Sequence, residues 1–330
     1  MSRLKGAPTD RPPRIVYLSP PGAGANLRIA NLDGSDPLQL TDVSTGVWDF
    51  AVSPDSTMIA YSALNMAGGA DVWVMDVEAR KSRIVAECGK EACLAPQWSP
   101  DGTRIAFERR PALPGSGPAD SRVWIADLAK GETVPLFADA GLKGHTPRWS
   151  FDGQYLSYYD LNQRGILFYN FASGQSRLIP TEHDSNGEWS PVAPVIVYHD
   201  LFIQGETVGT HLFFSDLSAP PLDLSGTEQT QDFSPAWSPD GKQIAFVRNL
   251  GGTVYQLRVT GTSADSHSQV LLQDTEASLS SLDWSPRGDA LILQRYNVLT
   301  GEGPSVVRLD LASGKVTKVI ELGTQPAWLR

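Results

Sequence analysis

The stretch APQWSPDGTRIAF (residues 95–107) returns later in the chain as SPAWSPDGKQIAF (residues 234–246). Less regular copies occur throughout the 330 residues, among them FAVSPDSTMIAY (50–61), PRWSFDGQYLSYY (147–159), GEWSPVAPVIVY (187–198), LDWSPRGDALIL (282–293) and a terminal PAWLR. The anchor position of this phrase, a Trp in all copies but the first, falls at residues 52, 98, 149, 189, 237, 284 and 328. Intervals in the forties over a whole chain are typical of a repeat architecture.

Each repeat divides into four short segments of β-strand character. In residues 97–138, Val, Ile, Phe and Trp dominate four runs, and Gly, Pro and Asp are found between them. In Ser-Pro-Asp-Gly the Pro presets φ, the Asp can bond back to the backbone and the Gly accepts a positive φ, which predicts a tight hairpin turn. The repeated phrase is therefore the first strand and first hairpin of a four-stranded unit.

Counting the strands predicts a ring. Second, third and fourth strands occur seven times from about residue 14, whereas first strands occur seven times from about residue 52 to the C-terminus. The first unit lacks its own inner strand, and PAWLR can supply it. We therefore predict one all-β domain over residues 14–330, a seven-bladed β-propeller whose antiparallel blades close when the C-terminal strand joins the N-terminal blade.

Composition excludes several functions. The net charge is −10, which argues against nucleic acid as a partner and against docking on an anionic membrane surface. No run of about 18 apolar residues exists, so we expect no membrane insertion. Residues 1–13 have no apolar core typical of a signal peptide, and we interpret them as a flexible leader or as the stub of a removed anchor.

The phrase WSPDG(K/T)xIAF, followed by text like LDGSDPLQLT, resembles the TolB-like, WD40-like (PD40) β-propeller family over about residues 14–330. The resemblance implies the propeller fold. Family members occur in periplasmic translocation proteins, as accessory domains of serine peptidases and in some polysaccharide lyases. The namesake of the family has six blades and a separate N-terminal domain. The similarity therefore lies in the sequence of the blades and not in the domain architecture.

The predicted strand order places two kinds of connection on opposite faces. Connections between first and second strands, and between third and fourth, are short turns on one face. The others are long, among them SALNMAGGAD (62–71), ERRPALPGSGPADS (108–121), DLFIQGETVGT (200–210) and QRYNVLTGEGPS (294–305). Long loops on a rigid scaffold often carry function, so we expect the binding face on this side. The run at residues 201–203 is either an exposed apolar patch or a strand continuation.

Residues just before each inner strand should surround the central channel on the long-loop face. They form a mildly acidic funnel with aromatic edges, which suits a peptide or a basic protein segment. The alternative is that they cap blade packing and turn backbones. We predict a partner site at Trp48, Asp49, His145, Asp184, Asn186, Asp232 and Phe233, with Leu94, Leu279 and Gln325 at equivalent positions.

The sequence lacks the common catalytic motifs. The chain has no G-x-S-x-G, no phosphate-binding Gly loop and no HExxH pair. Some lyases of the family hold a metal with several His residues, and His145 and His183 precede neighbouring inner strands. Three or more convergent ligands are usually needed, so we expect no metal, no cofactor and no catalytic residue. NLDGSD (31–36) resembles a calcium loop in composition only, because it lacks the downstream Glu.

Cys88 and Cys93 are the only cysteines and lie in one predicted loop, as CGKEAC. An even count with close spacing favours a small disulfide loop, with free thiols and a metal site as alternatives. A disulfide and the family resemblance favour a periplasmic or extracytoplasmic location, whereas the missing signal favours the cytoplasm if Met1 is the native start.

Our first hypothesis is a non-enzymatic, monomeric scaffold that binds a protein or peptide partner through the long-loop face and funnel. Two alternatives remain open. One is a metal-assisted polysaccharide lyase or hydrolase of the propeller type. The other is a ligand-sensing ectodomain of an anchored protein.

Overall fold

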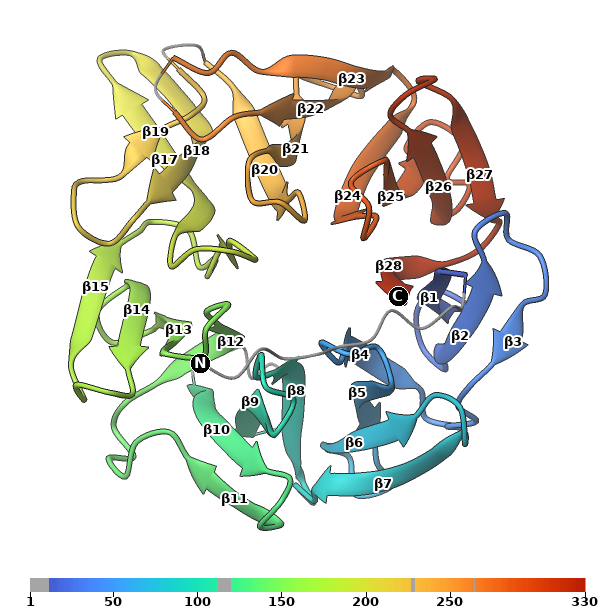
Figure 1. The fold of residues 1–330 in the computed structure, drawn as a ribbon, viewed down its shortest axis with the longest axis vertical. Helices are drawn as coiled ribbons and strands as arrows, with labels where there is room; N and C mark the ends of the chain where they lie inside the picture. The colour runs from blue at the N-terminus through green and yellow to red at the C-terminus, as the bar shows by residue number, and fades with distance from the viewer. Residues whose placement is uncertain (1–11, 112–119, 227–228, 264, 330) are drawn as a thin grey trace.

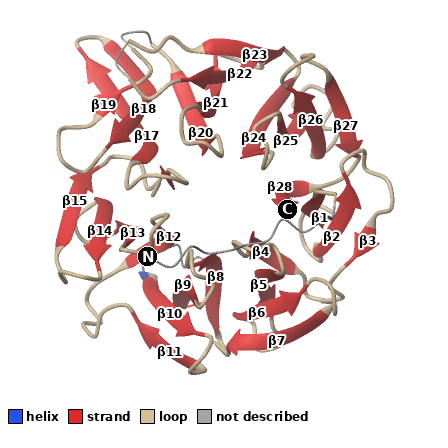
Figure 2. Ribbon diagram, viewed as in Figure 1, coloured by secondary structure: helices blue, strands red, loops and turns tan. Residues whose placement is uncertain are grey.

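The computed structural model describes residues 12–111, 120–226, 229–263 and 265–329. Most of the predicted leader, residues 1–11, therefore lies outside the described residues. The described strands form antiparallel sheets arranged as a ring around a centre (Figure 1). Figure 2 shows strands and loops throughout this ring. In the described part of the chain, no helix has the length and apolar character needed to span a bilayer.

The strands divide into groups of four, which we number as blades 1 to 7 in chain order. Three groups are separate sheets, and two pairs of groups are each joined into a larger sheet by a single parallel bridge. The first three blades contain β28 (Thr324–Leu329), β1 (Arg14–Ser19), β2 (Asn26–Asn31) and β3 (Leu38–Gln39); β4 (Val47–Val52), β5 (Met58–Leu64), β6 (Ala70–Asp76) and β7 (Lys81–Ala86); β8 (Glu91–Trp98), β9 (Arg104–Pro111), β10 (Arg122–Asp127) and β11 (Glu132–Pro135).

The remaining groups continue around the ring to blade 7. They contain β12 (Gly144–Trp149), β13 (Tyr155–Asp160), β14 (Gly165–Asn170) and β15 (Ser176–Pro180); β16 (Glu188–Trp189), β17 (Ile196–Gln204), β18 (Thr207–Ser215) and β19 (Leu222–Asp223); β20 (Gln231–Trp237), β21 (Ile244–Asn249), β22 (Tyr255–Thr260) and β23 (Gln269–Asp274); β24 (Ala277–Trp284), β25 (Ala290–Asn297), β26 (Ser305–Asp310) and β27 (Val316–Ile320). The predicted all-β propeller is confirmed, and this grouping is compatible with the predicted seven blades.

The ring closes through its two ends, as predicted. β28 pairs antiparallel with β1, with Trp328 opposite Ile15 and Leu329 opposite Arg14. The C-terminal strand thus becomes the inner strand of blade 1, and Figure 1 shows the C-terminus beside β1. Strand pairing between residues more than 300 positions apart therefore holds the first and last parts of the chain together.

The hydrophobic core lies between neighbouring blades. Each pair of neighbours shares its own cluster of buried residues, including the pair formed by blades 7 and 1. The cluster at this closing interface contains Ile15, Tyr17, Ile292 and Trp328. Face-to-face burial supplies the driving force that a single four-stranded sheet lacks.

The repeated Trp explains why the phrase recurs. The Nε1 atoms of Trp98, Trp237, Trp284 and Trp328 each donate to a carbonyl on the inner strand of the preceding blade, at 2.9–3.2 Å. The Trp therefore buries a large ring and satisfies its polar atom in the preceding blade. Trp149 differs, because its buried Nε1 has no partner among the described residues.

The Ser-Pro-Asp-Gly turns adopt the geometry that their residue types favour. In blade 6, Ser238 Oγ donates to Asp240 Oδ1 at 2.7 Å, and the same oxygen accepts the Lys242 amide at 3.1 Å. Gly241 has a φ of 68°, which a residue without Cβ adopts freely. The Ser238 hydroxyl, followed by the Lys242 amide, lowers the pKa of Asp240.

Candidate functional site

Antiparallel pairing within the blades determines which connections share a face. Connections from second to third strands, and from the fourth strand to the next blade, emerge on one face, which we call the long-loop face. The other connections emerge on the opposite face, which we call the short-turn face. One predicted long loop is wrong: residues 200–204 continue β17 and residues 207–210 begin β18, so only Gly205 and Glu206 connect them. The run at residues 201–203 is therefore a strand continuation.

A cavity of about 500 Å³ opens on the long-loop face between blades 4 and 5. We call it the His183 pocket. Its walls come from the β13–β14 turn and from the segment between β15 and β16, and they comprise Tyr159, Leu161, Arg164, Glu182, His183 and Asp184. An exposed ion pair between Arg164 and Glu182 crosses it at 3.5 Å. The pocket therefore contains two of the residue types expected at the funnel, an imidazole and a carboxylate.

The histidines around this pocket are arranged differently from the prediction. His183 packs edge-on against His199, with ring centroids 5.7 Å apart, and His145 instead packs on Tyr159 at 5.2 Å. Burial is the main cause that lowers the pKa of His145 and of His199, and the neighbouring His183 lowers that of His199 further. Burial of these two rings therefore favours their neutral imidazole forms.

Metal binding has limited support in this geometry. His183 and His199 bring two imidazoles together, but no three His, Cys, Asp or Glu side chains in the described ranges are placed to hold a metal ion. A protein site usually needs at least three such ligands. The residues present therefore do not fit a resident metal, and no metal-dependent step is derived from them.

The seven predicted funnel residues divide by exposure. Trp48 is 56% exposed and Asp184 is also exposed, so both can meet a partner. Asp49 and Phe233 are half-buried. The structure buries His145, Asn186 and Asp232, and sequence reasoning gave no sign of this.

Two of the buried residues serve the scaffold. Asn186 Nδ2 donates to the carbonyls of Thr146 and Ser157, at 2.6 and 3.0 Å, and so ties blade 5 to blade 4. Asp232 is fully buried and holds the Arg248 guanidinium with two bonds of 2.7 Å. Their contacts are those of the alternative interpretation, in which funnel residues cap the blade packing.

Asp49 caps a neighbouring blade from a desolvated position. Its Oδ2 accepts the amide of Ala95 at 2.7 Å, where a β-bulge gives Ala95 a φ of 52°. Its other oxygen is buried and forms no hydrogen bond of regular geometry within the described residues, although the Ser62 hydroxyl lies close enough to affect the carboxyl. Burial is the largest cause that raises the pKa of Asp49, from 3.8 to about 6, against the opposing effects of the Ser62 hydroxyl and then of the Ala95 amide.

This raised pKa predicts that ionisation of Asp49 destabilises the folded protein. Because the folded pKa exceeds the unfolded one, the stability that the neutral carboxyl contributes is lost as the pH rises from about 4 to about 6. We expect Asp49→Asn to raise the free energy of unfolding by about 1–3 kcal/mol at pH 7.5 and to have little effect at pH 4. Urea unfolding at the two pH values measures this.

Asp240→Asn is the matched control for that series, because the pKa of Asp240 is lowered and its stabilisation should be lost on neutralisation at pH 7.5. Equal effects of Asp49→Asn at both pH values would contradict the assignment.

A second buried polar group was missed from the sequence. His211 Nδ1 lies 2.8 Å from Asp223 Oδ2, and the imidazole stacks on Phe202 with ring centroids 3.8 Å apart. These residues stiffen the long β17–β18 hairpin of blade 5, whose tip exposes Ile203 and Val208. The stacking of Phe202 on His211 depends on the strand continuation at residues 201–203, which sequence reasoning left open against an apolar patch.

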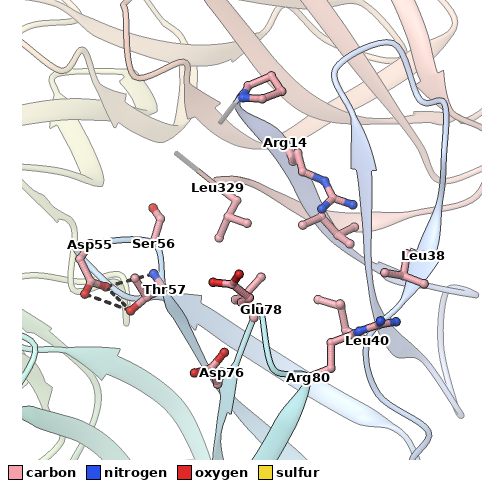
Figure 3. Close-up of a pocket in the computed structure, with 13 residues that line it drawn as sticks. Arg14, Leu38, Leu40, Asp55, Ser56, Thr57, Asp76, Glu78, Arg80 and Leu329 are labelled. Carbon is pink, nitrogen blue, oxygen red and sulfur yellow. Dashed lines mark hydrogen bonds between the residues drawn. The ribbon is translucent and has the colours of Figure 1, made fainter. Parts of the chain in front are cut away.

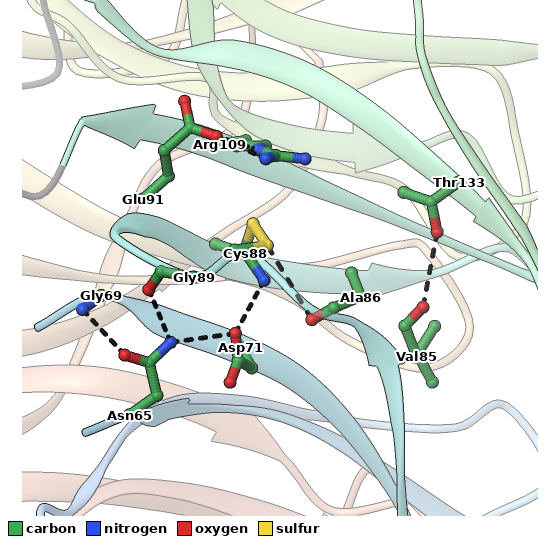
Figure 4. The surroundings of a disulfide bond; sticks show 11 residues. Asn65, Gly69, Asp71, Val85, Ala86, Cys88, Gly89, Glu91, Arg109 and Thr133 are labelled. Carbon is green, nitrogen blue, oxygen red and sulfur yellow. Dashed lines mark hydrogen bonds and ion pairs between the residues drawn. A yellow bond between two sulfur atoms is a disulfide. The ribbon is translucent and has the colours of Figure 1, made fainter. Parts of the chain in front are cut away.

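The two cysteines are joined in a disulfide, with Cα atoms 6.2 Å apart (Figure 4). Both are buried in the cluster between blades 2 and 3. The Cys88 amide donates to Asp71 Oδ1 at 2.8 Å, and Asn65 Nδ2 donates to the same oxygen and to the Gly89 carbonyl. The bond therefore fixes the β7–β8 connection on the long-loop face.

Comparison with known proteins identifies the family. The sequence profile described as the TolB beta propeller domain matches residues 3–200. The chain belongs to this family. TolB from Acinetobacter baumannii has a TM-score of 0.58 to this TolB-type propeller, with 18% identity over 99% of this chain and 69% of that chain.

Other proteins share the fold with different printed descriptions. An oligogalacturonate lyase from Vibrio parahaemolyticus has a TM-score of 0.66 at 11% identity, covering 93% of this chain and 86% of that one. The β-propeller domain of the Trilobed protease from Pyrococcus furiosus has a TM-score of 0.64 at 11% identity, covering 95% and 94%. At these identities the likeness shows the fold alone.

A curated relative is the uncharacterized peptidase YuxL of Bacillus subtilis, 24% identical over 197 residues. The match spans 48% of this chain and only 30% of the relative's length.

Proposed function

We propose that this TolB-type propeller is a non-enzymatic scaffold that binds a protein or peptide partner through its long-loop face. One observation carries the proposal. Of sixteen large apolar side chains exposed in the described residues, nine lie on the long-loop face, five on outer strands and two on the short-turn face. The nine are Trp48, Met66, Ile203, Val208, Leu250, Tyr296, Val298, Leu299 and Leu322.

The tips of four blades contribute to this set. Blades 2, 5, 6 and 7 each expose an apolar side chain at or beside the connection of their second and third strands, with Met66 at 89%, Ile203 at 64% and Leu299 at 63%. Exposed apolar side chains that gather on one face are typical of protein interaction surfaces. Trp48 adds a residue type that often dominates binding energy at interfaces.

Charge narrows the partner class. Asp184 and Glu182 are exposed at the His183 pocket, and the whole chain carries a net charge of −10. A partner with basic groups beside apolar ones would be steered to this face. The disulfide supports a location outside the cytoplasm, where we propose that the interaction takes place.

The test uses three baits bound to resin and a lysate of the source cells. The face variant combines Trp48→Ser, Leu250→Ser and Leu299→Ser. The control variant combines Ile84→Ser, Val134→Ser and Val270→Ser, which remove the same kind of side chain from outer strands. We expect a protein that the wild type and control retain and that the face variant retains at least tenfold less, measured by quantitative mass spectrometry.

Retention by the face variant equal to that by the control would contradict the proposal, as would the absence of any protein specific to the wild type. Circular dichroism of all three baits separates loss of binding from loss of folding.

A lyase or hydrolase remains the second candidate, because His183 and His199 stand beside a pocket of suitable size. Activity toward a panel of acidic and neutral oligosaccharides, lost in His183→Ala, would favour it over the scaffold.

A further inference from the structure

A second pocket lies on the short-turn face, between blades 1 and 2. Its volume is about 510 Å³, which is within the usual range of small-molecule sites. Figure 3 shows its walls, which come from β1, β2, β3, β28 and both turns of blade 2. They comprise Pro12, Arg14, Ile29, Leu38, Leu40, Asp55, Ser56, Thr57, Asp76, Val77, Glu78, Arg80 and Leu329. The pocket is thus built where the two ends of the propeller join, opposite the proposed partner face.

The pocket contains two guanidinium groups that the scaffold does not use. Within the described ranges, neither Arg14 nor Arg80 forms an ion pair or a side-chain hydrogen bond, and the buried Nε of Arg14 has no partner. Figure 3 shows both arginines on one side of the pocket and Asp55 on the other. Arg14 is half-buried and Arg80 is exposed, and guanidinium N–H groups without protein acceptors favour an anionic ligand.

The carboxylates nearby are engaged in their own turns. Asp55 accepts the amide and hydroxyl of Thr57, and Asp76 accepts the amide of Ala79 at 2.7 Å. They cap the backbone instead of neutralising the arginines. Their negative charge, together with that of Glu78, nevertheless disfavours a multiply charged anion such as phosphate more strongly than a group with a single charge.

The backbone of blade 2 is strained at this pocket. Ser56 and Arg80 have φ values of 58° and 52°, although neither is glycine. Blades 3, 4 and 7 have glycine at both equivalent turn positions, with φ values near 70°: Gly102 and Gly131, Gly153 and Gly174, Gly288 and Gly314. Blade 2 therefore has side chains at two turn positions where blades 3, 4 and 7 have glycine. Such strain is commonly retained at functional sites.

The remaining wall is apolar. Ile29, Leu40 and Leu329 are buried side chains that face the same cavity, and Leu38 lies at its rim. An anion held by the arginines would thus have an apolar surface beside it, and a ligand with a hydrocarbon portion would gain from covering it.

We propose that this pocket binds a small amphipathic carboxylate, with Arg14 and Arg80 holding the carboxylate and Leu38, Leu40 and Leu329 contacting the apolar part. The planar fork of a guanidinium matches a carboxylate better than other single-charged groups. The carboxylate can come from an apolar amino acid or from a simple organic acid. The site is independent of the proposed partner face, so either can fail without the other.

The test measures binding to the whole chain by isothermal titration and by thermal shift. The probes are leucine, 4-methylpentanoate, which lacks the amine, and 4-methylpentanamide, which lacks the charge. We expect saturable binding of at least one carboxylate and at least tenfold weaker binding of the amide. Leucine above 4-methylpentanoate assigns the source as an amino acid, and the reverse order assigns a simple acid; both support the site.

Three variants locate the binding. Arg80→Gly and Arg14→Gln should each weaken carboxylate binding at least tenfold, whereas Lys81→Ala, which removes an equal charge beside the pocket without lining it, should not. Arg80→Gly should also raise the melting temperature without ligand by about 1–3 °C, because glycine relieves the positive φ. A loss of binding therefore cannot be attributed to unfolding.

Two results would overturn the proposal. One is the absence of saturable carboxylate binding up to about 10 mM. The other is equal affinity of the wild type and Arg80→Gly, or of the carboxylate and its amide.

Discussion

Asp232→Ala should lower the free energy of unfolding by about 3–5 kcal/mol, because it leaves a buried guanidinium without its counter-ion. The Arg248 side chain is 6% exposed, and Asp232 is completely buried opposite it in the β20–β21 pair. Two bonds of 2.7 Å join them, and Ser225 Oγ donates to the same carboxylate at 2.6 Å. The change therefore removes one charge and also leaves a hydroxyl without its acceptor. Urea unfolding at pH 7 measures the loss.

Two controls test whether the unpaired buried charge causes this loss of stability. The double variant Asp232→Leu with Arg248→Met removes both charges, so no unpaired charge stays buried. It should therefore recover most of the stability. Glu182→Ala breaks the exposed pair with Arg164, whose side chains are 70% and 65% exposed, and should cost less than about 1 kcal/mol. A loss below about 1 kcal/mol for Asp232→Ala would show that water reaches Arg248 and that the pair is not buried in solution.

Asp232 also shows where sequence reasoning reaches its limit. Sequence reasoning placed it before an inner strand and assigned it to the funnel with Asp49 and Asp184, whereas the structure places it within β20. What decides its role is the residue opposite, and that depends on a register shift between Phe233 and Ala236 in β20. A bulge of this kind changes the face of the sheet to which a side chain points. The residue types alone do not predict the bulge.

The fold was predictable because each repeat contains the residues that determine its own turns and strands. Ser238, Asp240 and Gly241 act within a single turn, so a short stretch of sequence contains every residue that determines its geometry. The recurring Trp has one function in most blades, which is to pack and donate across to the preceding blade. Local chemistry repeated at a fixed period therefore predicts the architecture, including the closure by β28.

The pockets were not predictable, since they combine side chains from distant positions. His183 meets His199 only because the long segment before β16 folds back on blade 5, whereas neighbouring positions in the repeat had suggested His145. The pocket of the short-turn face joins Arg14 to Leu329, from opposite ends of the chain. The available signal was the absence of turn glycines in blade 2, at Ser56 and Arg80, which is visible once the repeats are aligned.

Trp328→Ala should lower the free energy of unfolding by about 3–5 kcal/mol. The ring is 6% exposed in the cluster between blades 7 and 1, its Nε1 donates to the Asp283 carbonyl, and its own amide donates to Asp283 Oδ2 at 2.9 Å. The strand that carries it is held by pairing with β1, not by a chain connection to that blade. A cavity here therefore weakens the noncovalent closure as well as the local packing, and thermal unfolding should begin with loss of blade 1.

Trp149 supplies the matched control, because it occupies the equivalent position in blade 4 but its Nε1 has no partner among the described residues. Phe in place of Trp keeps an aromatic ring and removes the donor. The Phe substitution should therefore cost about 1 kcal/mol more at Trp328 than at Trp149. Limited proteolysis of Trp328→Ala should cut first near the β1–β2 connection of blade 1, since an unclosed ring exposes that blade before the others. Uniform cleavage around the ring would instead show that closure contributes no more than any other blade interface.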